Sequence, residues 1–373
     1  MDKKTISSLY YNWWKNIDKF LFSLIILLFI TGLFFSLAST SLLISDKLDT
    51  NDYAFFFKHL SFVFLGVIVI FFLSSISEQK LFQFSPIIFV LSIIFLSLVP
   101  IIGVEVNNAQ RWIDLYLLPR FQPIELVKPF LIILTSLILS NEKYKNTYFK
   151  YSITFLITFV VSLFLIAQPD IGQSLLVFFS WSVLIFISGI SIFFLISSCL
   201  ILLTSLYFMV NFVAKFEYIK NRIKSFFDTE AGTHNAQSEK AIDSIYSGGY
   251  FGKGIGEGTL KNSVPEAHTD YIISVISEEF GVVAIILILL LFLIFIYSVF
   301  KKVYLENNER TKLILVGCTS LILVQAMIHI GVNIRLFPTT GMTLPFISYG
   351  GSSIISISIL SGIILNFTKR KIT

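Results

Sequence analysis

The sequence predicts an all-α integral membrane protein, folded as a single polytopic domain over residues 1–373. Hydrophobic residues make up 55% of the chain and charged residues only 14%, whereas soluble domains carry about 25% charged residues. The mean hydropathy is correspondingly high, at +0.83. The apolar residues also gather into repeated runs of the length that crosses a bilayer as a helix, which is about 20 residues. Together these observations predict about ten transmembrane helices.

Ten apolar stretches meet this length and account for most of the chain. The first is longer than the apolar region of a cleavable signal peptide, so we expect it to stay in the protein as a signal anchor. The sixth and seventh are separated only by Gly189 and its neighbours. The expected spans are residues 20–43, 53–75, 81–103, 123–141, 149–167, 171–189, 191–213, 270–300, 311–335 and 345–367.

Lysine and arginine residues in the short connections predict the orientation of these spans. They are concentrated in the N-terminal segment, in the loops after the fourth and eighth spans, and at the C-terminus. With ten spans, all four regions lie on one side, which the positive-inside rule assigns to the cytoplasm. These residues also explain the net charge of +5, so no nucleic-acid partner is expected.

Two loops on the opposite, outer side carry basic residues against this bias. The first runs over residues 104–122 and holds Arg111 and Arg120. The second is a large extracytoplasmic loop over residues 214–269, before the eighth span. Long loops are translocated regardless of their charge. Charges placed against the bias are nevertheless better candidates for a functional role.

The large loop has two internal features. Apolar residues at helical spacing, with lysines and an arginine between them, predict a basic amphipathic helix in the membrane interface over 216–227. A glycine-rich run over 248–258 follows. Because no strand precedes these glycines and no soluble α/β unit surrounds them, a dinucleotide-binding fingerprint is not expected. We interpret the run as a tight turn packed on the membrane domain.

Ionisable residues gather where the large loop returns to the membrane. Glu266, His268 and Asp270 fall within five positions, and a long apolar helix with Glu278 and Glu279 near its start follows. Charge at a membrane boundary is costly, so such residues usually face a cavity or a partner and serve a function. This cluster is therefore the first candidate for chemistry.

A second candidate lies at the start of the fourth span. Pro123 suits the first turn of a helix, and Glu125 and Lys128 then lie three residues apart on one face. Arg120, Lys128 and the helix N-terminus together favour an anion, particularly a phosphate. The alternative is structural, a Glu125–Lys128 pair that locks two helices together, and the sequence does not choose between them. By topology, this cluster lies on the same face of the membrane as Asp270.

The remaining polar and irregular features are interpreted first as structural. Asp170 is placed to cap the sixth helix or to pair with an arginine. His329, within the ninth span, is expected to be a packing residue. Residues 338–353 contain proline and glycines, and irregular backbone at this depth must be buried in protein or line a cavity. Cys199 and Cys318 lie in apolar stretches and predict neither a disulfide framework nor a metal site.

The sequence lacks the motifs of several soluble enzyme classes. It contains no P-loop, no HExxH and no GxSxG. No extracytoplasmic soluble domain is large enough to be an enzyme alone, so any chemistry must occur at the membrane surface of the helical bundle. A carboxylate and several cations on one outer surface suit an anionic, lipid-linked substrate. The cations would hold a pyrophosphate while the carboxylate takes a proton from an attacking hydroxyl.

Five stretches form a specific pattern: Arg120-Phe121-Gln122-Pro123 with Glu125 and Lys128, Gln168-Pro169-Asp170-Ile171-Gly172, Val264 to Asp270, Glu278-Glu279-Phe280-Gly281, and Leu344 to Ser353. This pattern resembles the SEDS family (shape, elongation, division and sporulation) of bacterial cell-wall proteins. The resemblance covers nearly the whole chain, including the ten spans and the outer loop before the eighth. Within the family it is strongest to the cell-division member, and the elongation member and a sporulation paralogue are the alternatives.

The resemblance implies a peptidoglycan glycosyltransferase that polymerises lipid II, an undecaprenyl-pyrophosphate-linked disaccharide peptide. It places the activity at the outer face of the bacterial cytoplasmic (inner) membrane during septal wall synthesis. The family's essential aspartate matches Asp270, its Arg and Lys match Arg120 and Lys128, and Glu125 fits the accompanying acid. The implied partners are lipid II, membrane lipid, a class B penicillin-binding protein transpeptidase and other divisome proteins.

These inferences combine into one hypothesis about the site. Asp270 acts as a general base, and Arg120 and Lys128 hold the departing pyrophosphate, with Glu125 beside them. No metal site and no cofactor are expected, and a divalent cation at the phosphate is left open. Departures from the family pattern at residues 107–110, 329 and 340 do not touch these residues. Supporting roles are expected for Asp170, Glu266, His268, Arg111 and Ser348.

Three other functions compete with this hypothesis. The first is polymerisation during cell elongation instead of division. The second is a lipid II flippase or transporter, which predicts charged residues across the bilayer midplane, whereas here the charges cluster near the outer face. The third is a pure scaffold for cell division, which leaves the outward-facing charged residues without a purpose.

Overall fold

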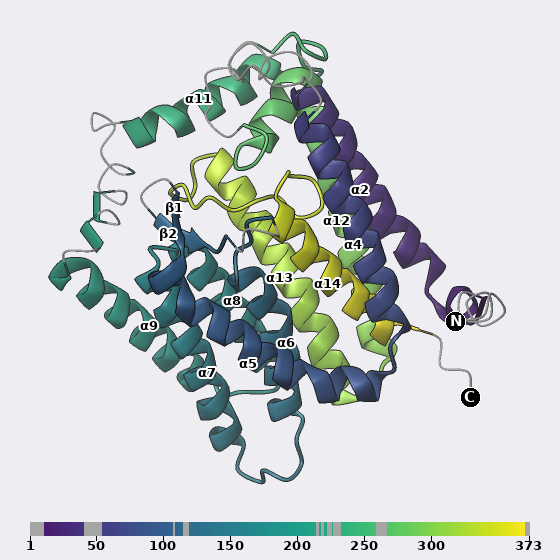
Figure 1. The fold of residues 1–373 in the computed structure, drawn as a ribbon, viewed down its shortest axis with the longest axis vertical. Coiled ribbons are helices and arrows are strands. Elements are labelled where there is room, and N and C mark those ends of the chain that lie inside the picture. The colour runs from purple at the N-terminus through teal and green to yellow at the C-terminus, as the bar shows by residue number, and fades with distance from the viewer. Residues whose placement is uncertain are drawn as a thin grey trace.

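The computed structural model describes residues 11–40, 54–106, 109–114, 119–213, 216–217, 220–221, 226, 233–258 and 267–369. Within these residues it is a bundle of long apolar helices with one short hairpin and one further helix at one end (Figure 1). The ten apolar helices are α2 (Lys19–Thr40), α4 (Ala54–Ser75), α5 (Glu78–Ile102), α6 (Ile124–Leu139), α7 (Thr147–Ala167), α8 (Ile171–Ile187), α9 (Ile192–Phe212), α12 (Ile272–Leu305), α13 (Glu309–Asn333) and α14 (Gly351–Phe367).

Each predicted span overlaps one of these helices, so the predicted multi-pass membrane fold is confirmed. Seven of the helices are long and apolar enough to cross a bilayer. The other three, α6, α8 and α14, have 16 or 17 residues. At 1.5 Å per residue such a helix is about 25 Å long, slightly less than the hydrocarbon core.

The last span differs most from its predicted bounds. The sequence predicts a span from residue 345, but α14 begins at Gly351. Residues 345–350 form turns instead, with Phe346 in the left-handed region at φ +66°. The Ser348 hydroxyl accepts a hydrogen bond from the Leu344 N–H and so closes the turn at 2.8 Å. The expected irregular backbone within 338–353 therefore extends to the first residue of α14.

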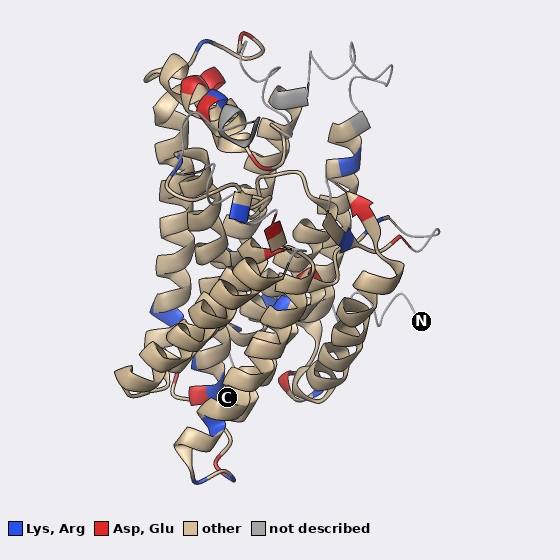
Figure 2. Ribbon diagram, turned by 90° about the vertical axis from the view of Figure 1, so that its left-hand side faces the viewer, with Lys and Arg blue, Asp and Glu red and all other residues tan. Residues whose placement is uncertain are grey.

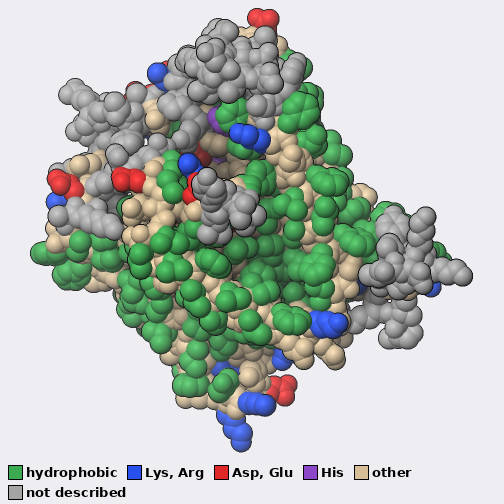
Figure 3. Space-filling model, viewed as in Figure 1, with side chains coloured by type: hydrophobic (Ala, Val, Ile, Leu, Met, Phe, Trp, Pro, Cys, Tyr) green, Lys and Arg blue, Asp and Glu red, His purple; other side chains and the backbone are tan. Residues whose placement is uncertain are grey.

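The helices differ strongly in how much of their surface other helices cover. In the apolar part of α13, 72% of the residues are buried, whereas only 11% are buried in α9. Helix α13 contacts α6, α8, α12 and α14, which places it at the centre of the bundle. Hydrophobic side chains cover much of the face of the bundle seen in Figure 3. Many charged residues lie towards the two ends of the bundle, and a few lie within it (Figure 2).

The loop over 104–122 contains a β-hairpin that was not predicted from the sequence. Strand β1 (Val104–Val106) pairs antiparallel with β2 (Ala109–Trp112). A further bridge joins Ile113 to Phe121. The hairpin directly follows α5 and brings β2 against the outer end of the bundle. This arrangement fixes the direction in which Arg111 points.

Helix α12 is broken near its outer end. Gly281 has φ +75° and ψ −179°, which are not helical values. The glycine-rich turn packs into this break: the N–H groups of Lys253 and Gly254 bond to the carbonyls of Glu278 and Glu279. The prediction of a tight turn packed on the membrane domain is thus confirmed. The predicted amphipathic helix over 216–227 lies mostly outside the described residues.

Helix α11 (Thr233–Gly248) leads into this turn and lies across one end of the bundle, against α12 (Figure 1). Ala241 packs with Tyr271 and Val332 in a small apolar cluster. An ion pair joins Glu239 to Arg335 over 3.4 Å. The large loop is therefore tied to the membrane bundle beside Asp270, through both α12 and α13.

Candidate active site

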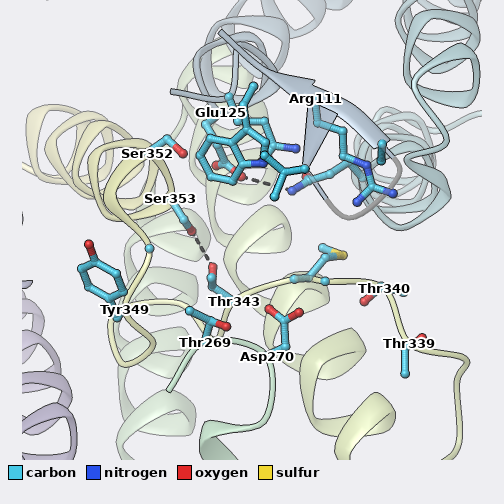
Figure 4. A pocket seen from close by; sticks show the side chains of 18 of the residues that line it. Arg111, Glu125, Thr269, Asp270, Thr339, Thr340, Thr343, Tyr349, Ser352 and Ser353 are labelled. Atoms are coloured by element: carbon cyan, nitrogen blue, oxygen red, sulfur yellow. Dashed lines mark hydrogen bonds between the residues drawn. The ribbon is translucent and has the colours of Figure 1, made fainter. Parts of the chain in front are cut away.

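A cavity of about 700 Å³ opens where the hairpin, α6, α11 and the outer ends of α13 and α14 meet. It brings together segments far apart in the sequence, including Asp270 and the start of α6 (Figure 4). Its polar lining includes Arg111, Arg120, Gln122, Glu125, Gln173, Gln237, Thr269, Asp270, Thr339, Thr340, Thr343, Tyr349, Ser352 and Ser353.

Asp270 sits on a backbone that three successive hydrogen bonds hold in place. The carbonyl of His268 accepts from the Tyr349 N–H at 3.3 Å. The carbonyl of Thr269 accepts from the Ser348 hydroxyl at 2.8 Å. The carbonyl of Asp270 itself accepts from Asn333 Nδ2 at 3.0 Å. These bonds fix the main chain that carries the carboxylate, and a fixed main chain helps to hold a catalytic group in a defined position.

Arg111 reaches the cavity from the side opposite Asp270 (Figure 4). Its guanidinium donates to the backbone carbonyls of Gln168, at 3.4 Å, and Pro169. Its Nε also lies 3.7 Å from the Asp170 carboxylate. A Cβ atom on Gly341 would lie 3.6 Å from Asp270 Oδ2 and 3.8 Å from Arg111 Nη1. Gly341 therefore marks the gap across which the carboxylate and the guanidinium face each other.

Asp170 makes both of the structural contacts that its position predicted. It caps α8 by accepting a hydrogen bond from the Gln173 N–H at 3.3 Å. It also lies beside Arg111 and accepts from Gln122 Nε2 at 2.9 Å. With an exposed fraction of 1%, Asp170 holds the hairpin, α6 and α8 together beneath the cavity.

Glu125 and Lys128 form a buried ion pair within α6. Lys128 Nζ lies 2.8 Å from Glu125 Oε2, and the side chains are 1% and 4% exposed. Gln173 of α8 donates to Glu125 Oε1 at 3.1 Å. Lys128 donates to Gln325 of α13 at 3.4 Å. The pair therefore makes the structural contact that was the alternative for it, since it links α6, α8 and α13, and Glu125 also lines the cavity.

Arg120 lies at the edge of the cavity, away from Lys128. Its side chain is 56% exposed and pairs with Asp114 at 3.0 Å. Lys128 is enclosed, and of these two residues only Arg120 lines the cavity in the described part of the chain. The expected cluster of Arg120 and Lys128 around one anion is thus not formed directly. The second guanidinium at the cavity is that of Arg111.

His268, Ser348 and Glu266 are the remaining residues that were predicted to support the site. Ser348 holds the turn around Asp270 through its hydrogen bond to the Thr269 carbonyl. His268 holds it through ring contacts, with centroid distances of 5.1 Å to Phe55 and 6.2 Å to Tyr349. Glu266 lies outside the described residues. His329 is buried and its Nδ1 is 2.7 Å from the Met342 carbonyl oxygen, which fits the packing role expected for it.

Three polar residues in this network were not singled out from the sequence: Gln173, Gln325 and Asn333. Asn333 accepts from the Ser274 hydroxyl at 2.9 Å and donates to the carbonyls of Asp270 and His329. Gln325 joins Lys128 to Thr343. Each is a neutral amide within an apolar helix. Because a buried amide needs a hydrogen-bond partner, this feature of the sequence could have identified all three.

Within the described residues, no group of three or more His, Cys, Asp or Glu side chains is placed to hold a metal ion. The polar groups at the cavity are instead carboxylates, guanidinium groups, amides and hydroxyls. This set suits the binding of an anionic, hydroxyl-rich molecule and proton transfer by Asp270.

Residues 18–372 match the family model of FtsW, RodA and SpoVE, which is described as cell cycle protein. The chain belongs to this family. The match covers every apolar helix of the bundle and both outer loops, so the resemblance found in the sequence motifs extends through the fold.

Individual relatives agree with this membership. The chain is 30% identical to the probable peptidoglycan glycosyltransferase FtsW of Caulobacter vibrioides, over 96% of this chain and 91% of the relative. It is similar to a solved chain described under the coordination of polymerization and crosslinking by a peptidoglycan synthase complex, with a TM-score of 0.77, 25% identity and coverage of 94% and 97%. It is also similar to the rod shape determining protein RodA of Thermus thermophilus, with a TM-score of 0.69, 25% identity and coverage of 94% and 96%.

Proposed function

We propose that this FtsW/RodA/SpoVE family protein is a peptidoglycan glycosyltransferase that polymerises lipid II into glycan strands at the outer face of the cytoplasmic membrane. The observation that carries the proposal is the placement of Asp270. Its carboxylate faces Arg111 across a cavity, on a turn whose three carbonyls are held by hydrogen bonds. The curated relative that is named a peptidoglycan glycosyltransferase supports the reaction class.

In this reaction Asp270 is the general base. It takes the proton of the acceptor sugar hydroxyl while the hydroxyl oxygen attacks the anomeric carbon of the donor. The bond from that carbon to the pyrophosphate oxygen breaks, and the lipid pyrophosphate leaves with the electron pair. Attack from the opposite side inverts the anomeric carbon. General-base catalysis of this kind contributes about 10²–10⁴-fold to a rate.

The cations at the cavity are assigned to the pyrophosphate. Arg120 lines the cavity at its edge, and Arg111 lies opposite Asp270. Guanidinium groups bind phosphate oxygens through paired, charge-assisted hydrogen bonds. Lys128 is enclosed and paired with Glu125. We therefore assign Lys128 to holding the charge and position of Glu125, and Arg111 with Arg120 to contacting the donor.

Partners and location follow from the same function. A transpeptidase of the penicillin-binding class must crosslink the new strand, and the similarity to a chain from a peptidoglycan synthase complex supports such a partner. Other divisome proteins are proposed for a division role at the septum. The N- and C-termini are proposed to be cytoplasmic, because lysines and arginines gather there and in the loops of the same side.

Strand synthesis and lipid movement measured in the same liposomes test the proposal. Purified protein, alone and with its transpeptidase partner, is expected to convert lipid II into glycan strands. The rate of lipid II movement across the bilayer is recorded in parallel. Movement of lipid II without strand synthesis, with or without the partner, would favour a flippase and overturn the proposal.

A further inference from the structure

The turn that fills the break in α12 exposes large apolar side chains. Tyr250 is 78% exposed, Phe251 84% and Ile255 60%. We call these three residues the loop tip. They stand on an otherwise polar, glycine-rich segment that includes Lys253 and Glu257. Leaving large apolar side chains in water is unfavourable, so the loop tip is expected to have an apolar environment.

The backbone of the loop tip is fixed to a defined height on α12. The N–H of Val282 donates to the carbonyl of Gly249 at 3.0 Å, and the N–H of Val283 donates to the carbonyl of Tyr250 at 3.2 Å. Gly252 and Gly281 allow this approach, because a Cβ on Gly281 would lie 2.2 Å from the Tyr250 carbonyl oxygen. The loop tip and the first residues of the second half of α12 therefore share one level.

That level lies about one hydrocarbon thickness away from the lysines at the other end of α12. Lys301 follows Val283 by 18 residues, which corresponds to about 27 Å of helix. The hydrocarbon core of a bilayer is about 30 Å thick. Lys301 and Lys302 mark the opposite end, where Lys302 pairs with Asp18 at 2.6 Å. With these lysines at one surface, Val283 lies at the other.

The apolar surface of α12 continues directly into the loop tip. Val282 and Val283 are 36% and 41% exposed, and Ile286, Leu287 and Leu290 on the same helix are also exposed. In a multi-pass membrane protein this surface faces lipid. Tyrosine is enriched at the boundary between headgroups and acyl chains, because its ring is apolar and its hydroxyl is polar. Phosphatidyl headgroups and the adjoining acyl carbons are the environment that suits both Tyr250 and Phe251.

We infer that the loop tip inserts into the headgroup region of the outer leaflet and anchors the large extracytoplasmic loop to the membrane beside the break in α12. This surface is separate from the cavity, since none of its residues is among those that line it in the described part of the chain. The anchor would hold the loop at the membrane beside the end of the first half of α12. This half begins two residues after Asp270.

Spin labels at single cysteines test this inference on the full chain in vesicles of phosphatidylethanolamine and phosphatidylglycerol. The background is Cys199→Ala, which leaves only the buried Cys318, and this background is labelled alone as a blank. Labels are placed at Tyr250→Cys, at Phe251→Cys and at Asp243→Cys. Asp243 is an exposed residue of α11 and serves as the water-facing control.

Collisions with oxygen, which concentrates in lipid, and with a water-soluble nickel chelate are then compared. At residues 250 and 251, oxygen is expected to dominate, and at residue 243 the nickel chelate is expected to dominate. Two results would overturn the inference. One is a loop-tip label as open to nickel as the label at 243, and the other is protection from both reagents, which indicates burial against protein. Two independent label positions guard against one variant that fails to fold.

Discussion

Asn333 holds the backbone of Asp270 by donating a hydrogen bond from its Nδ2 to the Asp270 carbonyl oxygen at 3.0 Å. Its Oδ1 accepts from the Ser274 hydroxyl at 2.9 Å, so the same amide also ties down the first turn of α12. Asn333 is completely buried at the end of α13. The position of the proposed base is therefore set by a neutral residue 63 positions away in the sequence.

Replacing Asn333 with alanine tests this positioning role. The Asn333→Ala variant is expected to lose about 10²-fold in strand synthesis, because a misplacement of about 1 Å of a catalytic group costs that much. Asn366→Ala is the matched control, since Asn366 is also buried and bonds to the carbonyls of Leu73 and Ile76 at the end of α14. Equal losses of activity per folded molecule in both variants would argue against a specific role for Asn333.

Replacing only one partner of the buried Glu125–Lys128 pair is expected to lower the free energy of unfolding. Lys128→Met leaves the Glu125 carboxylate without its partner, and we expect the free energy of unfolding to fall by about 3–5 kcal/mol. The double variant Glu125→Gln with Lys128→Met removes both charges and is expected to recover much of that loss. Thermal unfolding in detergent measures both. If the double variant is no more stable than Lys128→Met, the loss does not come from an unpaired charge.

Arg120 is expected to contribute to substrate binding and not to the stability of the fold. It pairs with Asp114 at an exposed site, and such pairs contribute about 0–1 kcal/mol. Arg120→Ala should therefore unfold close to the unmodified protein, yet lose about 10-fold or more in polymerisation, because a hydrogen bond to a charged group is worth about 1.5–3 kcal/mol. Asp114→Asn, which frees the guanidinium, should keep its activity. A large fall in unfolding temperature for Arg120→Ala would contradict this assignment.

Gly252 is expected to tolerate no side chain. Its φ is +79° and an added Cβ would lie 2.2 Å from the Glu279 carbonyl oxygen. Gly249 in the same turn has φ +56° but nothing within 4 Å of an added Cβ. Gly249→Ala therefore bears only the strain of the left-handed conformation, about 1–2 kcal/mol, while Gly252→Ala must also force the turn out of the break in α12. Equal unfolding temperatures for the two variants would show that the turn is not packed as described.

The sequence was most informative where composition and local motifs determine structure. The ten apolar stretches predicted the ten helices, and the cost of charge at a membrane boundary singled out Asp270. It was least informative about contacts between distant segments. The break at Gly281 depends on the close approach of Gly252, and the separation of Arg120 from Lys128 depends on Asp114 and Gln325. Such contacts are determined by packing between segments far apart in the chain.

The role of Asp270 is tested most directly by strand synthesis from lipid II with purified Asp270→Asn protein. Asparagine keeps the size of the side chain but cannot accept a proton as a base. The variant is expected to unfold at the same temperature as the unmodified protein and to polymerise about 10²–10⁴-fold more slowly. Glycan strands made at the normal rate by folded Asp270→Asn would contradict the account.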